Sequence, residues 1–248
     1  MSTVPLRKSL RLRFPRFVEM CSTVLTNLID RPRWRGMTIE QRFTEVYEKN
    51  RWGSAESISG EGSTVEHTAA IRAELPVIIQ RLSIRSMLDI PCGDYNWMHG
   101  LAHGLESYIG ADVVRALVES NQELYSSSGV SFRQLDVTCD SLPQVDLVFC
   151  RDCLMHLSNA QVQAAIGNIV RSGSTWLATT SFHNPGRNRD TVAGGFRALN
   201  LCQSPFDFPP PAVSMDEKWP PSSNKFLDFW SIEDLRRAME GRARAMPD

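Results

Sequence analysis

The chain has 248 residues, of which 42% are hydrophobic and 22% charged, and a formal net charge of −1. These values are typical of a globular protein with one large domain. The near-zero charge gives no indication of nucleic-acid binding, and no apolar run is long enough to span a bilayer. Six scattered cysteines favour reduced thiols over a disulfide framework, so we expect a cytoplasmic location.

Residues 1–36 are predicted to form a basic N-terminal arm. The first eighteen residues contain five basic side chains and no acidic one. A solvated arm is the simplest interpretation of this pattern. Targeting to an organelle and weak contact with a membrane surface are the alternatives.

Residues 37–82 are predicted to form a helical cap of two helices joined by a loop rich in Gly and Ser. Apolar residues at helical spacing predict the first helix over 38–49. Ser63 and Glu66 have the S-x-x-E spacing of a capping box, which predicts that the second helix begins there. Pro76 is expected to kink or divide that helix.

Residues 83–248 are predicted to form the catalytic domain. Its first part alternates strand and helix patterns, which predicts parallel strands joined by right-handed crossovers. The expected fold class is α/β, a Rossmann-like, doubly wound and mostly parallel sheet. Residues 182–230, rich in Pro and Gly, are expected to form a lid. The predicted strands cover 86–90, 107–111, 131–135, 145–150, 175–181 and 225–230, and the predicted helices 113–125, 159–171 and 231–239.

Acidic residues follow the first three predicted strands. In a doubly wound sheet, ligands bind outside the carboxyl ends of the strands, at the switch in strand order. Asp112 ends the second strand 23 residues after Asp89, where a carboxylate accepts hydrogen bonds from ribose hydroxyls. Asp136 follows the third strand, where an adenine amino group would lie. Gly93, in the turn after Asp89, lets the backbone approach a ligand closely.

The turn after the first strand does not suit a dinucleotide. Pyrophosphate sites use an open G-x-G-x-x-G turn, whereas this turn contains Pro91 and Tyr95, and the acids Asp89 and Asp94 would repel phosphates. S-adenosylmethionine (AdoMet) has no phosphate and carries sulfonium and ammonium groups that suit these acids. We therefore predict AdoMet as the cofactor, with a nicotinamide oxidoreductase as an alternative.

Four segments resemble, in order, the motifs of class I AdoMet-dependent methyltransferases: 87–93, 108–112, 135–137 and 145–157. The first also resembles a smaller group of bacterial methyltransferases with the motif LDxPCGDxxWM, often associated with sugar modification. Pro91 and Tyr95 depart from the glycines of the usual motif. The resemblance implies that the cofactor is held by Asp89, Pro91, Gly93, Asp94, Asp112, Asp136, Val137 and Arg151.

The same resemblance raises an expectation about the end of the chain. The methyltransferase fold usually closes with an antiparallel strand pair, and little chain follows Trp230 to supply it. We therefore expect the C-terminal part to be irregular or shortened.

The turn after the fourth strand contains the predicted catalytic residues. His156 is predicted to be a general base for a hydroxyl acceptor, and Asp152 to orient it or to bind substrate. A structural histidine and a helix N-cap are the alternatives for these two residues. No metal site is predicted. In the lid, the predicted ligands of an oxygen-rich acceptor are His183, Arg187, Arg197 and Asn200.

The predicted function is AdoMet-dependent methylation of a small acceptor, most simply a sugar hydroxyl. A catalytically silent AdoMet-binding module or partner subunit is the alternative. No nucleic-acid partner is expected, and the sequence leaves the oligomeric state open.

Overall fold

The computed structural model describes residues 31–101, 104–218 and 224–245. The prediction of a basic arm therefore lies largely outside the described residues. Its last part contains the short helix α3 (Arg31–Arg33) and Trp34, whose side chain is buried. The guanidinium of Arg51 lies 5.1 Å from the centroid of the Trp34 ring. No helix in the described ranges is long and apolar enough to cross a membrane.

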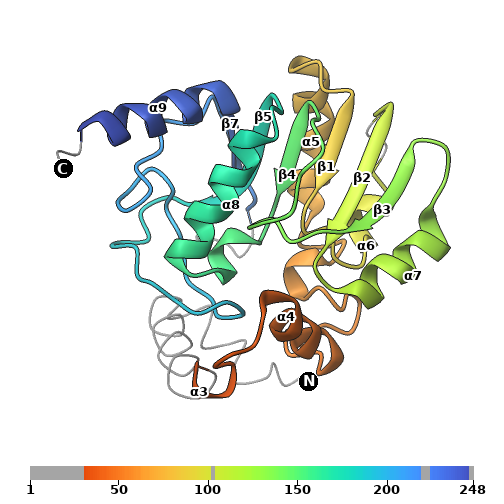
Figure 1. Cartoon of the computed structure of the whole chain (residues 1–248). Coiled ribbons are helices and arrows are strands. Elements are labelled where there is room, and N and C mark those ends of the chain that lie inside the picture. The colour runs from red at the N-terminus through yellow and green to blue at the C-terminus, as the bar shows by residue number, and fades with distance from the viewer. Residues whose placement is uncertain (1–30, 102–103, 219–223, 246–248) are drawn as a thin grey trace, which may run out of the picture.

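A seven-stranded sheet with the order β3-β2-β1-β4-β5-β7-β6 forms the centre of the molecule (Figure 1). The first five strands along the chain are parallel, and β7 is antiparallel to both β5 and β6. This arrangement confirms the predicted Rossmann-like, doubly wound and mostly parallel fold. The strands are β1 (Ser86–Asp89), β2 (Ser107–Asp112), β3 (Val130–Gln134), β4 (Leu147–Cys150), β5 (Trp176–Phe182), β6 (Val213–Asp216) and β7 (Lys225–Ser231).

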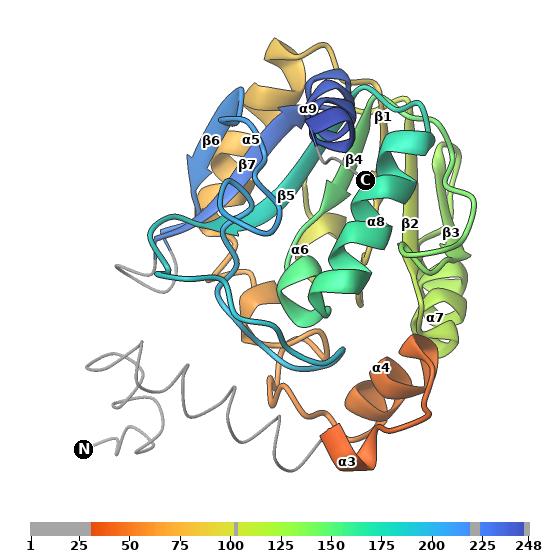
Figure 2. The same cartoon turned by 60° about the vertical axis from the view of Figure 1, so that its left-hand side comes forward.

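Helices cover both faces of the sheet (Figure 1, Figure 2). Buried side chains of α8 (Asn159–Arg171) and α9 (Ile232–Ala245) pack on one face, and those of α5 (Ala69–Arg81) and α6 (Asn96–His99) on the other. A further helix, α7 (Arg115–Tyr125), contacts β2 and β3. Because helices bury both faces, the central strand β4 is apolar along its whole length.

The cap differs from its prediction at the second helix. The first helix, α4 (Ile39–Glu48), begins with a capping box between Thr38 and Gln41. The predicted capping box at Ser63 and Glu66 is wrong, because Ser63 ends the 3-10 turn η2 (Glu61–Ser63) and α5 begins only at Ala69. A further stretch of turns separates the two helices. The helix α5 also continues unbroken through Pro76, so the proline does not divide it.

The C-terminal part completes the sheet, so the expectation of an irregular or shortened end is wrong. The closing antiparallel pair consists of β6, which lies inside the predicted lid segment, and β7, which coincides with the strand expected over 225–230. The strand β6 has only four residues and follows Pro209-Pro210-Pro211, a context that gives no strand signal. Between β5 and β6, residues 183–212 form neither helix nor strand.

Candidate functional site

The switch in strand order lies between β1 and β4, because β2 and β3 follow on one side of this pair and β5 on the other. Ligands of doubly wound sheets bind at such a point, outside the carboxyl ends of the strands. The turns that follow β1, β2 and β4 therefore form the candidate site. The cap helix α4 lies at the same edge, where Gln134 Nε2 donates to Glu40 Oε1 over 2.9 Å (Figure 1).

The carboxyl group of Asp89 is buried at the end of β1. Its Oδ2 accepts a hydrogen bond of 2.6 Å from the hydroxyl of Tyr108. Burial raises the pKa of Asp89 to about 7, against the Tyr108 hydrogen bond and the charge of Arg151, which lower it. A cation placed beside Asp89 would favour its ionised form.

Asp112, at the end of β2, is buried beside the same turn. Its Oδ2 accepts from the amide of Gly93 over 3.1 Å, and its Oδ1 accepts from the amide of Val114 over 2.9 Å. Burial raises the pKa of Asp112 to about 6, although these backbone hydrogen bonds lower it. Two buried acids with raised pKa values thus lie on either side of the glycine turn.

The two residues that depart from the usual glycine motif are accommodated in different ways. Tyr95 has φ of 57°, the left-handed conformation that a glycine would adopt there. Such a conformation costs a non-glycine residue about 1–3 kcal/mol. The Tyr95 ring is buried with centroid distances of 5.1 Å to Tyr108, 5.2 Å to Phe132 and 5.3 Å to Tyr125. Aromatic pairs contribute about 0.5–1.5 kcal/mol each, which offsets the strain.

Pro91 lacks an amide hydrogen, but its neighbours keep the turn joined to the sheet. The amide of Ile90 donates to Phe149 O and the amide of Cys92 donates to Ala111 O, each over 2.8 Å. The turn is therefore tied to β4 on one side of Pro91 and to β2 on the other. The second acid of this turn, Asp94, faces the cap, and its carboxylate accepts hydrogen bonds from residues 57–59.

Asp136 and Val137 lie just beyond β3, which ends at Gln134. Asp136 Oδ1 accepts from the amide of Thr138 over 2.8 Å and from its hydroxyl over 2.6 Å, so this oxygen stabilises its own turn. The carbonyl of Val137 accepts from Asn168 Nδ2 over 3.0 Å. Both residues lie at the carboxyl edge, as predicted, in a turn anchored to α8.

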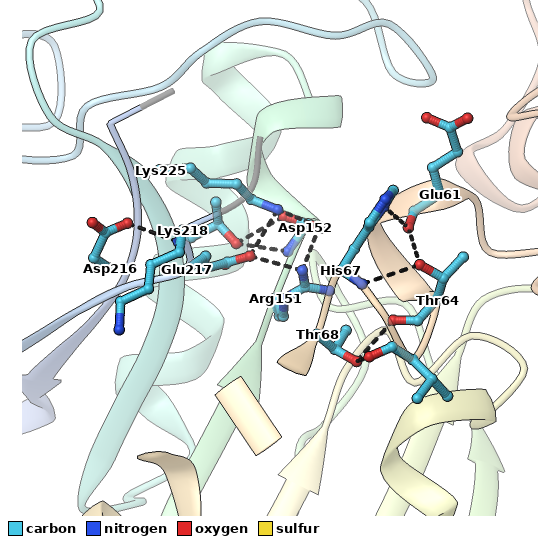
Figure 3. A network of polar contacts seen from close by, with 12 residues as sticks. Glu61, Thr64, His67, Thr68, Arg151, Asp152, Asp216, Glu217, Lys218 and Lys225 are labelled. Carbon is cyan, nitrogen blue, oxygen red and sulfur yellow. Dashed lines mark hydrogen bonds and ion pairs between the residues drawn. The ribbon is translucent and has the colours of Figure 1, made fainter. Parts of the chain in front are cut away.

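A cluster of four charged side chains lies at the end of β4, two from the residues that follow β4 and two from the region of β6 and β7 (Figure 3). Arg151 NH2 lies 2.7 Å from Glu217 Oε2 and 3.3 Å from Asp152 Oδ2. Lys225 Nζ lies 2.7 Å from Asp152 Oδ2 and 2.9 Å from Glu217 Oε2. The guanidinium of Arg151 also lies 5.5 Å from the ring centroid of Trp97. Each of the two cations therefore contacts both carboxylates. Arg151, predicted to hold the cofactor, uses its Nη2 for these contacts, whereas its buried Nε has no hydrogen-bond partner among the described residues.

The cluster determines the ionisation of Asp152. Although burial opposes it, the positive charges of Arg151 and Lys225 hold the pKa of Asp152 well below its usual range. Asp152 Oδ1 also accepts from Thr180 Oγ1 over 3.0 Å. An acid with so low a pKa is a poor proton acceptor, so a basic role for this residue is disfavoured.

His156 lies in the 3-10 turn η3 (Leu154–His156). Its Nδ1 is 2.6 Å from the carbonyl oxygen of Gly195, and since a carbonyl only accepts, Nδ1 carries the hydrogen. Burial lowers the pKa of His156, which leaves Nε2 as an unprotonated acceptor at neutral pH. The lid residue Gly195, rather than Asp152, is thus the hydrogen-bond partner that orients the imidazole.

Two aromatic side chains flank the His156 imidazole. The ring of Trp52, from the cap, is 5.6 Å away, and that of Phe196, from the lid, is 5.9 Å away. Trp52 is 37% exposed, although it is a large apolar side chain. The cap and the lid therefore meet at this histidine.

Of the four residues predicted to bind the acceptor, His183, Arg197 and Asn200 have separate partners. His183 Nε2 lies 2.8 Å from Asp228 Oδ2, and its ring stacks on Phe226 at 3.9 Å. Arg197 is buried and donates to the Leu157 carbonyl, and Asn200 Oδ1 accepts from the Cys202 amide over 2.9 Å. Arg187 is exposed. In the described part of the chain, no hydrogen bond or ion pair joins any two of these four residues.

Sequence reasoning missed three residues of the site. Glu217 lies in a segment whose apolar residues follow neither helix nor strand spacing. Lys225 begins β7, and the neighbouring strand β6 was not predicted. Gly195 contributes only its carbonyl, which no side-chain pattern reveals. In the described part of the chain, no group of three or more metal-binding side chains occurs.

Comparison with known proteins agrees with this geometry. Residues 87–173 match a family model described as a methyltransferase domain. The matched segment runs from β1 to α8 and includes the turns that follow β1, β2 and β4. No curated protein sequence matches the chain significantly.

The chain is also similar over part of its length to several solved structures. Phosphoethanolamine N-methyltransferase 1 from Haemonchus contortus is 22% identical, with a TM-score of 0.47, over 66% of this chain and 37% of that one. Human N-acetylserotonin methyltransferase is 14% identical, with a TM-score of 0.46, over 76% and 59%. Magnesium protoporphyrin IX methyltransferase from Synechocystis PCC 6803 is 15% identical, with a TM-score of 0.44, over 62% and 81%. These low scores carry no information about the acceptor.

Proposed function

We propose that the chain is an AdoMet-dependent methyltransferase that methylates a hydroxyl group of a small acceptor, such as a sugar. The observation that carries the proposal is the pair of buried acids, Asp89 and Asp112, on either side of the Gly93 turn at the switch point. Their burial favours a ligand that brings positive charge and no phosphate. The methyltransferase-domain match over the same strands supports this choice.

Different residues of the chain would bind the cofactor and accept the proton of the acceptor. When bound, AdoMet supplies an electrophilic methyl group. Asp112 would accept hydrogen bonds from the ribose hydroxyls, and Asp89 would face the positively charged methionine end. Asp136 and Val137 would border the adenine. His156 Nε2, as the unprotonated nitrogen, would receive the proton of the acceptor hydroxyl.

Replacing Asp112 by asparagine is expected to weaken AdoMet binding about tenfold to a hundredfold. The reason is that charge-assisted hydrogen bonds contribute about 1.5–3 kcal/mol each. Isothermal titration with AdoMet and with its demethylated product S-adenosylhomocysteine (AdoHcy) measures this. Glu119→Gln, on the exposed side of α7, is the control and should bind as the wild type does.

Unchanged affinity in folded Asp112→Asn protein would contradict the placement of the ribose. No binding of either ligand by folded wild-type protein would contradict the proposed function itself. Binding without transfer to any of a panel of monosaccharides would favour the silent AdoMet-binding module instead. Methyl-labelled AdoMet detects that transfer directly.

AdoMet binding is also expected to strengthen as the pH rises from about 5 to about 8. In the free protein the pKa values of Asp89 and Asp112 are about 7 and about 6, so both acids carry a proton at the lower pH. A cationic ligand favours the ionised acids, and binding near pH 6 therefore releases protons. Titration in two buffers of different ionisation enthalpy counts them. Asp89→Asn should remove much of the dependence, and a flat profile in the wild type would rule out a cation beside these acids.

A further inference from the structure

The cap loop, residues 52–63, is fastened to the turn after β1 through Asp94. The Asp94 carboxylate accepts from Ser57 Oγ over 3.0 Å, from the Ile58 amide over 2.9 Å and from Ser59 Oγ over 3.1 Å. In return, Ser59 Oγ accepts from the Asp94 amide over 2.9 Å. Both carboxylate oxygens therefore accept hydrogen bonds from the cap loop, and the backbone amide of Asp94 donates one to the loop.

A second attachment lies beside the first. Glu56 Oε1 accepts from Asn96 Nδ2 over 2.8 Å and from the Val65 amide over 2.7 Å, which joins the loop to the start of α6. The loop also packs closely against Gly93, where a Cβ atom would collide with the Ser59 hydroxyl. The absence of a side chain at Gly93 is thus what lets the loop settle on the turn.

The two ends of the loop, at Trp52 and Gly62, contact the turn after β4. A Cβ atom on Gly62 would lie 3.0 Å from Asp152 Oδ2, so the loop backbone passes directly over that carboxylate. Trp52 approaches His156, with 5.6 Å between the ring centroids. The Cβ atom of Trp52 lies 3.0 Å from the position that a Cβ on Gly60 would take, so the loop folds back closely on itself between these two residues.

The cap loop therefore joins the β1 turn to the β4 turn, and the switch point lies between these two strands. We infer that the cap loop is the roof of the cofactor site, and that Asp94 is a positioning residue that holds the roof in place rather than a ligand of the cofactor. The inference rests on the proposed function only in naming the cofactor. The sequence places Asp94 beside the cofactor, but its hydrogen-bond partners belong to the loop.

A fastened roof has a kinetic consequence. AdoHcy can leave and AdoMet can enter only when the loop lifts, and lifting it breaks the hydrogen bonds to the Asp94 carboxylate. Hydrogen bonds to a charged group are stronger than those between neutral groups. Asp94 accepts three of them from the loop, whereas the loop carboxylate of Glu56 accepts one from Asn96, so the Asp94 contacts are the larger barrier to opening. Removing these hydrogen bonds should accelerate both the dissociation and the association of the ligand. The dissociation rate should rise by the larger factor.

The test compares Asp94→Ala, Asp94→Asn and the control Glu119→Gln with the wild-type full chain. Dissociation of AdoHcy is followed by stopped-flow fluorescence after displacement with excess AdoMet. We expect the rate to rise about tenfold or more in Asp94→Ala and less in Asp94→Asn, which keeps one acceptor oxygen for the Ile58 amide. Hydrogen exchange without ligand should become faster in residues 52–63 in the same order.

The Ser57→Ala/Ser59→Ala double variant removes the donors from the loop side and leaves the β1 turn intact, so it tests the same contacts if Asp94→Ala does not fold. An unchanged AdoHcy dissociation rate together with unchanged exchange in residues 52–63 would overturn the inference. Failure of the wild type to bind AdoHcy would instead contradict the proposed function. The exchange measurement without ligand would then still decide whether Asp94 holds the loop.

Discussion

His156→Ala is expected to lower the rate of methyl transfer by about 10²- to 10⁴-fold, the usual contribution of a general base. Affinity for AdoHcy should change little, because the cofactor acids lie on β1 and β2. The structural basis is the hydrogen bond from Nδ1 to Gly195, which leaves Nε2 as the proton acceptor. Transfer from methyl-labelled AdoMet to the acceptor found by screening gives the rate. His99→Ala, at an exposed histidine, is the control.

The pH dependence of the rate provides an independent test of this role. Burial lowers the pKa of His156 below its ordinary value of 6.5. The rate should therefore rise with pH, reach half its maximum below 6.5 and stay level above neutrality. A wild-type rate in the folded His156→Ala protein would show that the histidine is structural. His183, held by the buried Asp228, would then be the next base to replace.

Glu217→Ala is expected to destabilise the fold by about 3–5 kcal/mol, because it leaves two buried cations short of a partner. For a chain of this size, that corresponds to a fall in Tm of roughly 6–20 °C. Denaturant unfolding measures the change. The matched control is Glu106→Ala, which breaks the exposed ion pair with Arg85 at 3.5 Å and should cost less than about 1 kcal/mol. Equal stability of the two variants would mean that the cluster adds nothing to the fold.

The cluster also predicts how stability depends on pH. The folded pKa of Asp152 lies below its unfolded value of about 4, so its contribution is present above pH 4 and is lost as the pH falls below that. Lys225→Met removes one of the two cations beside Asp152 and should weaken this dependence. If the acid side of the profile is unchanged in Lys225→Met, Arg151 alone sets the ionisation of Asp152.

Much of the fold was predictable because it depends on local pattern. The helix over 159–171 was predicted with the boundaries that the structure has. Its apolar spacing agrees with its burial against the sheet. By contrast, Ser63 and Glu66 have the right spacing for a capping box, but the chain there makes turns that carry the cap loop back over the site. Tertiary contacts decide the conformation of such a segment. The strand β6 was missed because its pairing with β7, rather than its composition, makes it a strand.

For the site, the sequence predicted where the residues lie along the sheet better than it predicted their hydrogen-bond and ion-pair partners. Asp89, Asp112 and Asp152 lie at the carboxyl edge because a residue that ends a parallel strand must lie there. Their hydrogen bonds and ion pairs could not be predicted in the same way. Ser59 is 35 residues from Asp94, and Glu217 is 66 residues from Arg151. Contacts at such separations depend on how the cap and the closing strands fold onto the sheet, which no local spacing encodes.

The position of β7 has a consequence for biosynthesis. This strand is translated after β6, yet it lies between β5 and β6 and pairs with β5 over seven residues. While residues 225–231 are still in the ribosome, the seven-residue strand β5, which is buried in the folded protein, has an open edge, and open edges are templates for aggregation. The nascent chain thus cannot close its sheet until β7 has left the ribosome. A ribosome stalled before residue 225 would hold a chain that needs a chaperone to cover that edge.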